Sequence, residues 1–270
     1  MMSPVRVGDR GPGVPSALIL LKRAGRLFAR RLRHGADPNV TNPLRAHLWN
    51  LWRFHFARPF TTDKVQCPFC GYSGPAFLAR GDWLAMAYDS VCPGCDARSR
   101  HRGLRHVLPG VLRRAPDGPI LSFAPEPVLL DWLRTVTSRA ILTTDYDMTS
   151  PVTYPGEDIQ RLTLPDRSVA VILCNHVLEH IPDDRAALRE CARDLQPGGL
   201  AVFTIPGDYP AQTTRTFPVP DLNGHYRHYG LDVITKMRES FTHVEAINMH
   251  ALALSKARVR EDDMAFLCRQ

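Results

Sequence analysis

Four cysteines stand in two CxxC pairs whose spacing is typical of a structural zinc site. The pairs are Cys67/Cys70 and Cys92/Cys95, and 21 residues separate them. Each pair contains or precedes Pro or Gly, which lets backbone amides turn toward the sulfurs. Four thiolates close a tetrahedral coordination sphere, so the predicted zinc is structural and leaves no open position for catalysis. The alternative is four unrelated reduced cysteines, but paired CxxC motifs in an intracellular chain favour a metal.

A second metal-like pattern is HVLEH at residues 176–180, which spells the H-x-x-E-H signature of an inverted zinc peptidase. Such a peptidase needs both histidines on one face of a long helix. Here the motif directly follows an apolar run, and Pro182 lies two residues after His180. We therefore expect a strand end and a single turn, with a new helix capped at Asp183 or Asp184. No third ligand is marked, so Glu179 and His180 are expected either to fix this turn through hydrogen bonds to the backbone or to act in catalysis.

The elements that would position these residues alternate between strands and helices from Gly118 onward. Apolar runs predict strands at 118–125, 139–147, 168–175, 200–206, 242–249 and 263–268. Helical spacing predicts helices at 128–136, 183–195 and 231–241, and QPGG at 196–199 predicts a turn. This alternation predicts an α/β protein with a doubly wound, Rossmann-like, mostly parallel sheet. Ligands of such sheets bind beyond the carboxyl ends of the strands, at the topological switch point.

Candidate binding residues follow three of the predicted strands. They are Phe123, Ala124, Pro125 and Glu126 after the first, Asp145 after the second, and Asn175 and His176 after the third. Asp145 comes 21 residues after Ala124, the interval at which a nucleoside-binding half-sheet places a carboxylate against ribose hydroxyls. A further acidic segment with Asp158 and Ile159 precedes the third strand.

Residues 158–206 resemble the core of class I S-adenosylmethionine-dependent methyltransferases, in particular the type 11-like domain. The shared pattern is an acidic residue, an LP-D-x-S segment, an apolar strand, LEH, a helix and a PGG turn before the next strand. The resemblance extends over about residues 118–270. Together with the CxxC pairs, FAPE and HYRHYG, it is similar to bacterial methyltransferases that carry an N-terminal zinc-binding segment.

This resemblance implies an S-adenosylmethionine site at the predicted sheet edge. Asp145 would hold the ribose, and Asp158 would accept a hydrogen bond from the adenine amino group, with the Ile159 amide beside it. The segment from Phe123 to Glu126 would lie along the methionine part, and Asn175 and His176 would line the floor. The family's glycine-rich first loop is absent, because SFAPEP stands in its place. A non-catalytic, zinc-stabilised binding module with a degenerate cofactor site is therefore an alternative.

Methyl transfer from a sulfonium is an in-line displacement, and positioning can supply most of its catalysis. A base is needed only for a poorly ionised hydroxyl or a protonated amine. The long aromatic and basic connection at 208–230 follows a strand end, as a substrate lid would. The predicted catalytic residues are His176, His180, His225 and His228, and the alternative is that HYRHYG only packs the lid.

The positive charge is concentrated near the N-terminus. The net charge is +7, but residues 1–60 hold 11 basic and 2 acidic residues, which leaves 23 basic and 25 acidic residues for the remainder. Residues 17–34 predict an amphipathic helix with a basic face, which either packs on its own domain or contacts an anionic membrane surface or nucleic acid. No apolar run is long enough to span a bilayer or form a signal peptide, so a cytoplasmic protein is expected.

We therefore expect three parts: a basic helical arm at 1–60, a zinc-ribbon-like segment at 61–105 and a methyltransferase domain at 106–270. The expected activity is methyl transfer to an oxygen or nitrogen atom of a small-molecule, saccharide or lipid-linked acceptor. An alternative is an RNA methyltransferase that docks through the zinc ribbon and the basic arm.

Overall fold

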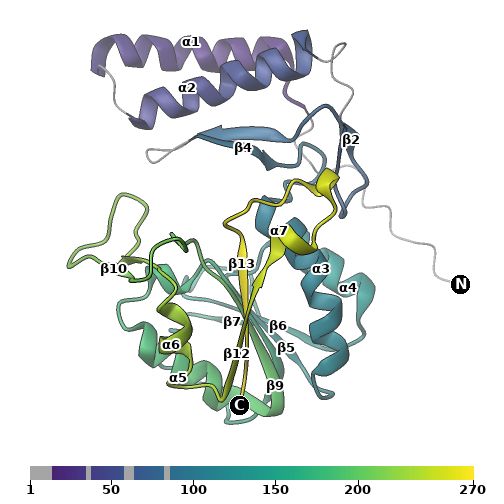
Figure 1. The fold of residues 1–270 in the computed structure, drawn as a ribbon, viewed down its shortest axis with the longest axis vertical. Helices are drawn as coiled ribbons and strands as arrows, with labels where there is room; N and C mark the ends of the chain where they lie inside the picture. Colours follow the sequence, from purple (N-terminus) through teal and green to yellow (C-terminus); the bar gives the residue numbers. More distant parts are fainter. Residues whose placement is uncertain (1–13, 35–37, 58–63, 82–85) are drawn as a thin grey trace, which may run out of the picture. The chain divides into compact units, whose positions relative to one another are not determined.

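The computed structural model describes residues 14–34, 38–57, 64–81 and 86–270, which divide into two units (Figure 1). The first unit comprises the described residues up to Arg102 together with Ala253–Arg258. The second comprises Gly103–Leu252 and Val259–Gln270. The predicted arm and most of the predicted zinc-ribbon-like segment fall in the same unit.

The first unit combines two long helices with short hairpins. Its elements are α1 (Ala17–His34), α2 (Pro38–Leu51), a π-helical turn (Trp52–Phe56), β1 (Val65–Gln66), β2 (Ser73–Gly74), β3 (Leu78–Gly81), β4 (Met86–Val91) and the 3-10 turn η4 (Ser255–Ala257). The buried Asn50 ties α2 to β3, because its amide donates to the Ala79 carbonyl at 2.9 Å and accepts from the Ala79 amide at 2.7 Å. The helix predicted at 17–34 is confirmed. Pro38 begins α2, since proline is tolerated at the first helical position.

Arg102 is fully buried within the first unit. Its guanidinium lies 4.0 Å from the Phe77 ring centroid and donates to main-chain carbonyls, which are those of Asp89, Ser90, Ala97, Ala257 and Arg258. Five N–H donors in a fixed fork suit a site crowded with carbonyls. Arg102 therefore joins the second cysteine turn to the C-terminal segment Ala253–Arg258 and does not lie on a surface that could contact phosphate.

The second unit is built on a seven-stranded sheet with the order β12-β13-β9-β8-β5-β6-β7. Its strands are β5 (Ile120–Phe123), β6 (Ile141–Asp145), β7 (Tyr154–Pro155), β8 (Val169–Asn175), β9 (Leu195–Thr204), β12 (His243–Asn248) and β13 (Met264–Arg269). All pairs are parallel except those of β13, which is antiparallel to both neighbours. This arrangement confirms the predicted α/β class and the mostly parallel, Rossmann-like sheet.

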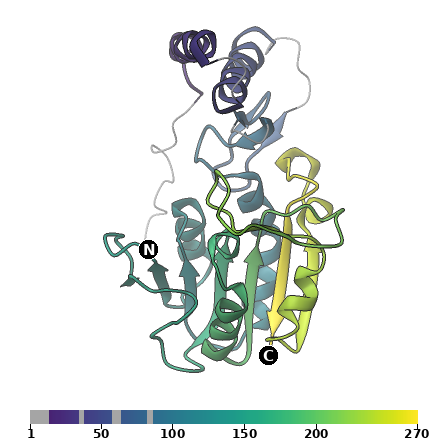
Figure 2. The same ribbon diagram turned by 90° about the vertical axis from the view of Figure 1, so that its left-hand side faces the viewer.

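Helices cover both faces of this sheet (Figure 1 and Figure 2). They are α3 (Ser99–Arg114) and α4 (Pro127–Val136) on one face, and α5 (Asp184–Asp194) and α6 (Val233–Met237) on the other. The remaining helical elements are η3 (Leu178–His180) and α7 (Met249–Leu252). Every residue of β8 is buried, as expected for a central strand covered on both faces.

Short elements and one turn differ from the prediction. The predicted turn at 196–199 lies within β9, where Gly198 has a φ of +77° and the pairing with β8 shifts register. The edge strand β7 and the lid hairpin of β10 (Arg215–Thr216) and β11 (Arg227–His228) were not predicted. Strands of two residues are too short to show an alternating pattern.

Candidate functional site

The four predicted zinc ligands lie together in the first unit. The sulfurs of Cys67, Cys70, Cys92 and Cys95 all lie within 4.8 Å of one another, and none forms a disulfide. The Cys67–Cys95 and Cys70–Cys92 sulfur distances are both 3.6 Å. Sulfurs bound tetrahedrally to one zinc ion at about 2.3 Å would lie about 3.8 Å apart. The spacing of this cysteine cluster therefore fits a zinc ion closely.

The two turns that supply these sulfurs use the same hydrogen bonds. The amide four residues after the first cysteine donates to its carbonyl at 3.0 Å, from Gly71 in one turn and from Asp96 in the other. The first cysteine's own amide donates at 2.9 Å to the carbonyl five residues later. Gly71 and Asp96 both have a positive φ, +73° and +60°. Each turn therefore fixes its two sulfurs locally.

The close approach of the four sulfurs shifts the pKa values of the thiols in opposite directions. Hydrogen bonds with Cys67 are the largest cause that lowers the pKa of the Cys70 thiol and raises the pKa values of Cys92 and Cys95. The Gly94 amide lies 3.3 Å from the Cys92 sulfur and donates to it. A thiolate is the form that binds metal, and amide donors stabilise it. A zinc ion held by all four sulfurs would have no coordination position left for a substrate.

The predicted cofactor residues meet at the carboxyl ends of three adjacent strands. Phe123 pairs with Thr144 of β6 on one side and with Cys174 of β8 on the other. The next residues along each strand, Ala124, Asp145 and Asn175, therefore stand at the same level. The chain passes from β5 to β6 on one side and later to β8 on the other, so β5 marks the topological switch point.

Two residues at this edge adopt the left-handed backbone conformation that normally favours glycine. Ala124 follows β5 with a φ of +41°, and His176 follows β8 with a φ of +53°. Their amides donate to the Thr144 and Thr204 carbonyls at 2.9 and 2.8 Å, which holds both turns against neighbouring strands. Strained positions of this kind concentrate at functional sites. Ala124 thus takes a glycine-like conformation although the loop lacks glycine.

Asp145 and Asp158 lie in connected segments. The Asp145 carbonyl accepts from the Gly156 and Glu157 amides at 2.8 and 3.1 Å, so the chain entering Asp158 is fixed to the end of β6. The Asp145 carboxylate accepts from the Asp147 amide at 3.0 Å. The Asp158 carboxylate accepts from the Gln160 amide at 2.9 Å. Ile159 is buried.

The HVLEH segment forms the expected strand end and single turn. Residues 178–180 are the 3-10 turn η3, and Asp183 caps α5 by accepting from the Ala186 amide. His176 precedes η3, so the two histidines do not share a helical face and the peptidase arrangement is absent here. The Asn175 side chain accepts from the Thr204 hydroxyl at 3.1 Å, which fixes this side chain at the end of β8.

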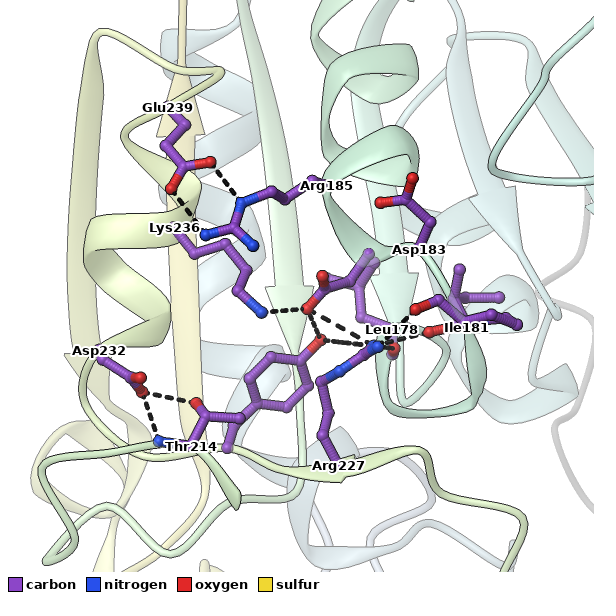
Figure 3. A network of polar contacts seen from close by, with 12 residues as sticks. Leu178, Ile181, Asp183, Arg185, Thr214, Arg227, Asp232, Lys236 and Glu239 are labelled. Atoms are coloured by element: carbon purple, nitrogen blue, oxygen red, sulfur yellow. Dashed lines mark hydrogen bonds and ion pairs between the residues drawn. The ribbon is translucent and has the colours of Figure 1, made fainter. Parts of the chain in front are cut away.

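The lid is fastened to this turn by a buried arginine. Figure 3 shows Arg227 of the lid reaching Leu178 and Ile181, whose carbonyls accept from it at 3.2 and 2.6 Å. Arg227 also lies 3.5 Å from the buried Asp184 carboxylate. Lys236 of α6 donates to the same carboxylate at 2.6 Å. Arg227 therefore holds the lid in place, which is the packing role that the sequence left open for HYRHYG.

The lid brings further titratable groups next to the HVLEH turn. We call Glu179, His180, Asp221, His225 and His228 the lid cluster. The His180 and His225 rings are in edge contact with centroids 4.8 Å apart, and His225 and His228 centroids are 6.0 Å apart. Burial, and secondarily the nearby His180, lowers the pKa of His225, which favours its neutral imidazole. Of the predicted catalytic histidines, His176 lies just outside this group, with its Nδ1 3.5 Å from Glu179 Oε1.

Two residues of the site had not been predicted. Asp221 anchors the lid because its carboxylate accepts from the Asn223 and His225 amides and from His228 Nε2. The sequence DLNG around it is a recognisable side-chain turn signal. Gln160 accepts from the Asp183 amide at 3.0 Å and so connects the Asp158 segment to α5. No sequence pattern marks that contact.

Comparison with known proteins finds similarity in the residues around this sheet edge. Residues 123–203 match the family described as "Methyltransferase domain". A probable S-adenosylmethionine-dependent methyltransferase of Mycobacterium tuberculosis is 30% identical over 109 residues, which is 37% of this chain and 39% of that protein. A ubiquinone biosynthesis O-methyltransferase of Coxiella burnetii is 34% identical over 53 residues, 20% of this chain and 23% of that protein. The chain thus aligns with about two fifths or less of the length of these curated relatives.

Two solved structures are similar to the chain at lower identity. A S-adenosylmethionine-dependent methyltransferase from Mesorhizobium loti is 18% identical, with a TM-score of 0.47 over 65% of this chain and 98% of that one. The 1,6-didemethyltoxoflavin-N1-methyltransferase of Burkholderia thailandensis is 13% identical, with a TM-score of 0.46 over 64% of this chain and 78% of that one. The matched residues 123–203 include the ends of β5, β6 and β8. Over these residues the chain is similar to the methyltransferase domain of that family.

Proposed function

We propose that the chain transfers a methyl group from S-adenosylmethionine to an oxygen or nitrogen atom of a small-molecule, saccharide or lipid-linked acceptor. The observation that supports this most strongly is the switch point, where Ala124, Asp145 and Asn175 end three adjacent parallel strands at one level. Cofactors of doubly wound sheets bind at such a point. The matched methyltransferase family covers the same strands.

The cofactor would lie across these strand ends. Asp145 would accept hydrogen bonds from the ribose hydroxyls, and Asp158 with the Ile159 amide would hold the adenine. The turn from Phe123 to Glu126 would run along the methionine part, with Asn175 and His176 as the floor. The left-handed Ala124 lets the backbone come close to the ligand without the usual glycine.

The transfer itself requires little covalent chemistry from the protein. The acceptor atom attacks the methyl carbon, the carbon–sulfur bond breaks, and its electron pair returns to sulfur to give S-adenosylhomocysteine. Fixing the acceptor in line with that bond supplies most of the rate enhancement. A hydroxyl acceptor must also lose a proton, for which His176 and the lid histidines are the candidates.

A titration with S-adenosylhomocysteine tests the proposed cofactor site. We expect wild-type protein to bind it, and Asp145→Ala to weaken binding by about 2 kcal/mol, because hydrogen bonds to a charged group are lost. Asp147→Ala is the matched control, since Asp147 is an exposed carboxylate in the same loop. Equal affinities of the two variants would refute the role of Asp145, and no binding by wild-type protein would favour the degenerate binding module.

We also propose that the cysteine cluster binds a structural zinc ion through Cys67, Cys70, Cys92 and Cys95. The support is the sulfur spacing, the matching pair of turns and the absence of disulfides among them. Bound zinc would cross-link the two turns and so fix the first unit. It would not take part in methyl transfer, because four protein ligands saturate it.

For the predicted partner of α1, we propose an anionic lipid surface. Leu20 and Ala24 are buried, but an apolar stripe on the adjoining side of the helix is exposed: Leu18 by 60%, Leu21 by 52%, Phe28 by 56% and Leu32 by 74%. Lys22 and Arg26 are exposed beside it. An exposed apolar stripe next to basic residues is typical of helices that lie in a membrane interface. Among the described residues, no helix has the length and apolar character needed to cross a bilayer.

Vesicle sedimentation tests this partner. We expect binding to phosphatidylglycerol vesicles and little binding to phosphatidylcholine vesicles, with loss of binding in Phe28→Ser/Leu32→Ser. Leu254→Ser is the control, because Leu254 is an equally exposed leucine outside α1. Salt-dependent binding to RNA that the double variant does not change would instead favour the RNA methyltransferase.

A further inference from the structure

Three groups of the lid cluster have the composition of a metal site. One ligand atom each from Glu179, His180 and His225 lies within 4.8 Å of the other two. Glu179 is only 1% exposed, and it reaches this position from η3, whereas His225 comes from the lid. Two imidazoles and one carboxylate are a common ligand set of catalytic metal sites.

The hydrogen bonds of His180 show which ring nitrogen is available. Its Nδ1 lies 3.0 Å from the Gly224 carbonyl oxygen. A carbonyl only accepts, so Nδ1 carries the proton and Nε2 carries a lone pair. This Nε2 lies 3.9 Å from Glu179 Oε1, close to the separation of about 3.4 Å expected between tetrahedral nitrogen and oxygen ligands of one metal ion. Metal-binding histidines commonly donate their other nitrogen to a backbone carbonyl in this way.

His225 is held beside a carboxylate by its main chain. Its main-chain amide donates to Asp221 Oδ1 at 3.0 Å, and its Nδ1 lies 4.0 Å from Asp221 Oδ2. The 4.0 Å separation is too long for a hydrogen bond, but it places Asp221 on the Nδ1 side of the ring and leaves Nε2 as the nitrogen for a metal. Asp221 therefore helps to place His225 through the main-chain bond.

The neighbouring group Asp221, His225 and His228 also has its ligand atoms within 4.8 Å, but its hydrogen bonds argue against a metal. Arg215 lies 3.1 Å from His228 Nδ1, and a guanidinium only donates. His228 Nδ1 must then accept, so Nε2 carries the proton and donates to Asp221 Oδ2 at 2.8 Å. His228 consequently has no lone pair to offer and serves to hold Asp221.

We infer that Glu179, His180 and His225 bind a divalent transition-metal ion such as zinc, separate from the ion of the cysteine cluster. Three protein ligands leave a coordination position open, as in catalytic sites. The ligand for that position is an oxygen atom of the acceptor, a hydroxyl whose acidity the metal increases. This role depends on the proposed methyl transfer, whereas metal binding by the three residues does not. With His180 and His225 as ligands, His176 or solvent would take the hydroxyl proton. On transfer the oxygen–methyl bond forms and the methyl–sulfur bond breaks, with its electron pair returning to sulfur.

Metal content after equilibrium dialysis against zinc tests the inference without any activity assay. We expect two zinc ions per wild-type chain and one in His180→Asn, whose side-chain amide can still donate to the Gly224 carbonyl but offers no lone pair in place of Nε2. His225→Ala should also bind one. His243→Ala should bind two, because His243 is an exposed histidine on β12, outside the lid cluster.

Cobalt(II) distinguishes the two sites. The cysteine cluster gives thiolate-to-cobalt charge-transfer absorption, and the lid site does not, so cobalt bound in Cys67→Ser without that absorption would support the lid site. One zinc per wild-type chain, or two in His180→Asn, would overturn the inference. Binding of S-adenosylhomocysteine is measured in parallel: cofactor binding with a single metal refutes the lid site alone, whereas two metals without cofactor binding refute only the proposed methyl transfer.

Discussion

The cysteine cluster takes its sulfurs from two tight turns, and each turn is fixed by hydrogen bonds between residues four or five apart. The lid cluster takes its groups from the turn at 176–180 and from a loop that is 44 residues later at the His180–Gly224 bond. The first can form as soon as its turns form and a metal joins them. The second exists only after the sheet, η3 and the lid have packed. The two regions should therefore depend on different interactions: the cysteine cluster on its local turns and the metal that joins them, and the lid cluster on the buried contacts that pack the lid against the sheet unit.

Loss of a cysteine is the change with the largest expected effect. Cys67→Ser should abolish zinc binding by the cysteine cluster, with a loss on the order of 10 kcal/mol of metal-coupled folding free energy. Metal analysis and near-ultraviolet circular dichroism would measure this. Cys268→Ser is the control, because Cys268 is buried in the sheet unit, outside the cysteine cluster. A Cys67→Ser protein that still binds zinc at the cysteine cluster would show that this region does not depend on its four sulfurs.

The buried carboxyl group of Asp194 should make the stability of the sheet unit depend on pH. Burial raises the pKa of Asp194 from 3.8 to about 7. The folded state therefore holds a proton that the unfolded chain has lost, so the free energy of unfolding should fall as pH rises from about 4 to about 7, by up to about 4 kcal/mol. Asp194→Asn should flatten this dependence, as measured by hydrogen exchange of the β8 and β9 amides at pH 5 and pH 8. An unchanged pH profile would contradict the assignment.

Loss of Arg227, which fastens the lid, should lower stability more than loss of an exposed arginine. Arg227→Met leaves the Ile181 and Pro182 carbonyls without their donor and removes one of the two cations beside the buried Asp184, so it should cost about 3 kcal/mol in urea denaturation. Arg185→Met is the matched control, because Arg185 pairs with Glu239 at the exposed surface and its loss should produce no measurable change (Figure 3). Similar losses in both variants would mean that the lid does not depend on buried contacts.

The smallest predicted effect concerns the local geometry of the cysteine turns. Gly71→Ala should lower stability by about 1 kcal/mol, because its φ of +73° disfavours any side chain. Gly25→Ala in α1 should raise it by about 0.5–1 kcal/mol, since nothing lies within 4 Å of the added methyl group and alanine favours helix. Thermal unfolding of the zinc-loaded proteins would show opposite shifts, and shifts of the same sign would contradict the predicted turn strain.

The same contrast explains what could be predicted from sequence. The CxxC spacing predicted the cysteine cluster because each turn is encoded by adjacent residues. Apolar runs predicted β5, β6 and β8 and therefore the edge that joins Ala124, Asp145 and Asn175. The antiparallel β13 between β9 and β12, and the approach of His225 to His180, depend on tertiary packing that no local pattern encodes. The Arg215–His228–Asp221 hydrogen bonds, which decide between two metal groupings, could be seen only in three dimensions.

The most direct test of the central claim is a crystal structure of the zinc-loaded protein with S-adenosylhomocysteine. We predict that its ribose hydroxyls lie within hydrogen-bond distance of the Asp145 carboxylate, that its adenine lies beside Asp158 and Ile159, and that its sulfur points toward His176 and the lid. A ligand bound elsewhere, or none at a concentration that saturates other methyltransferases, would contradict the proposed cofactor site.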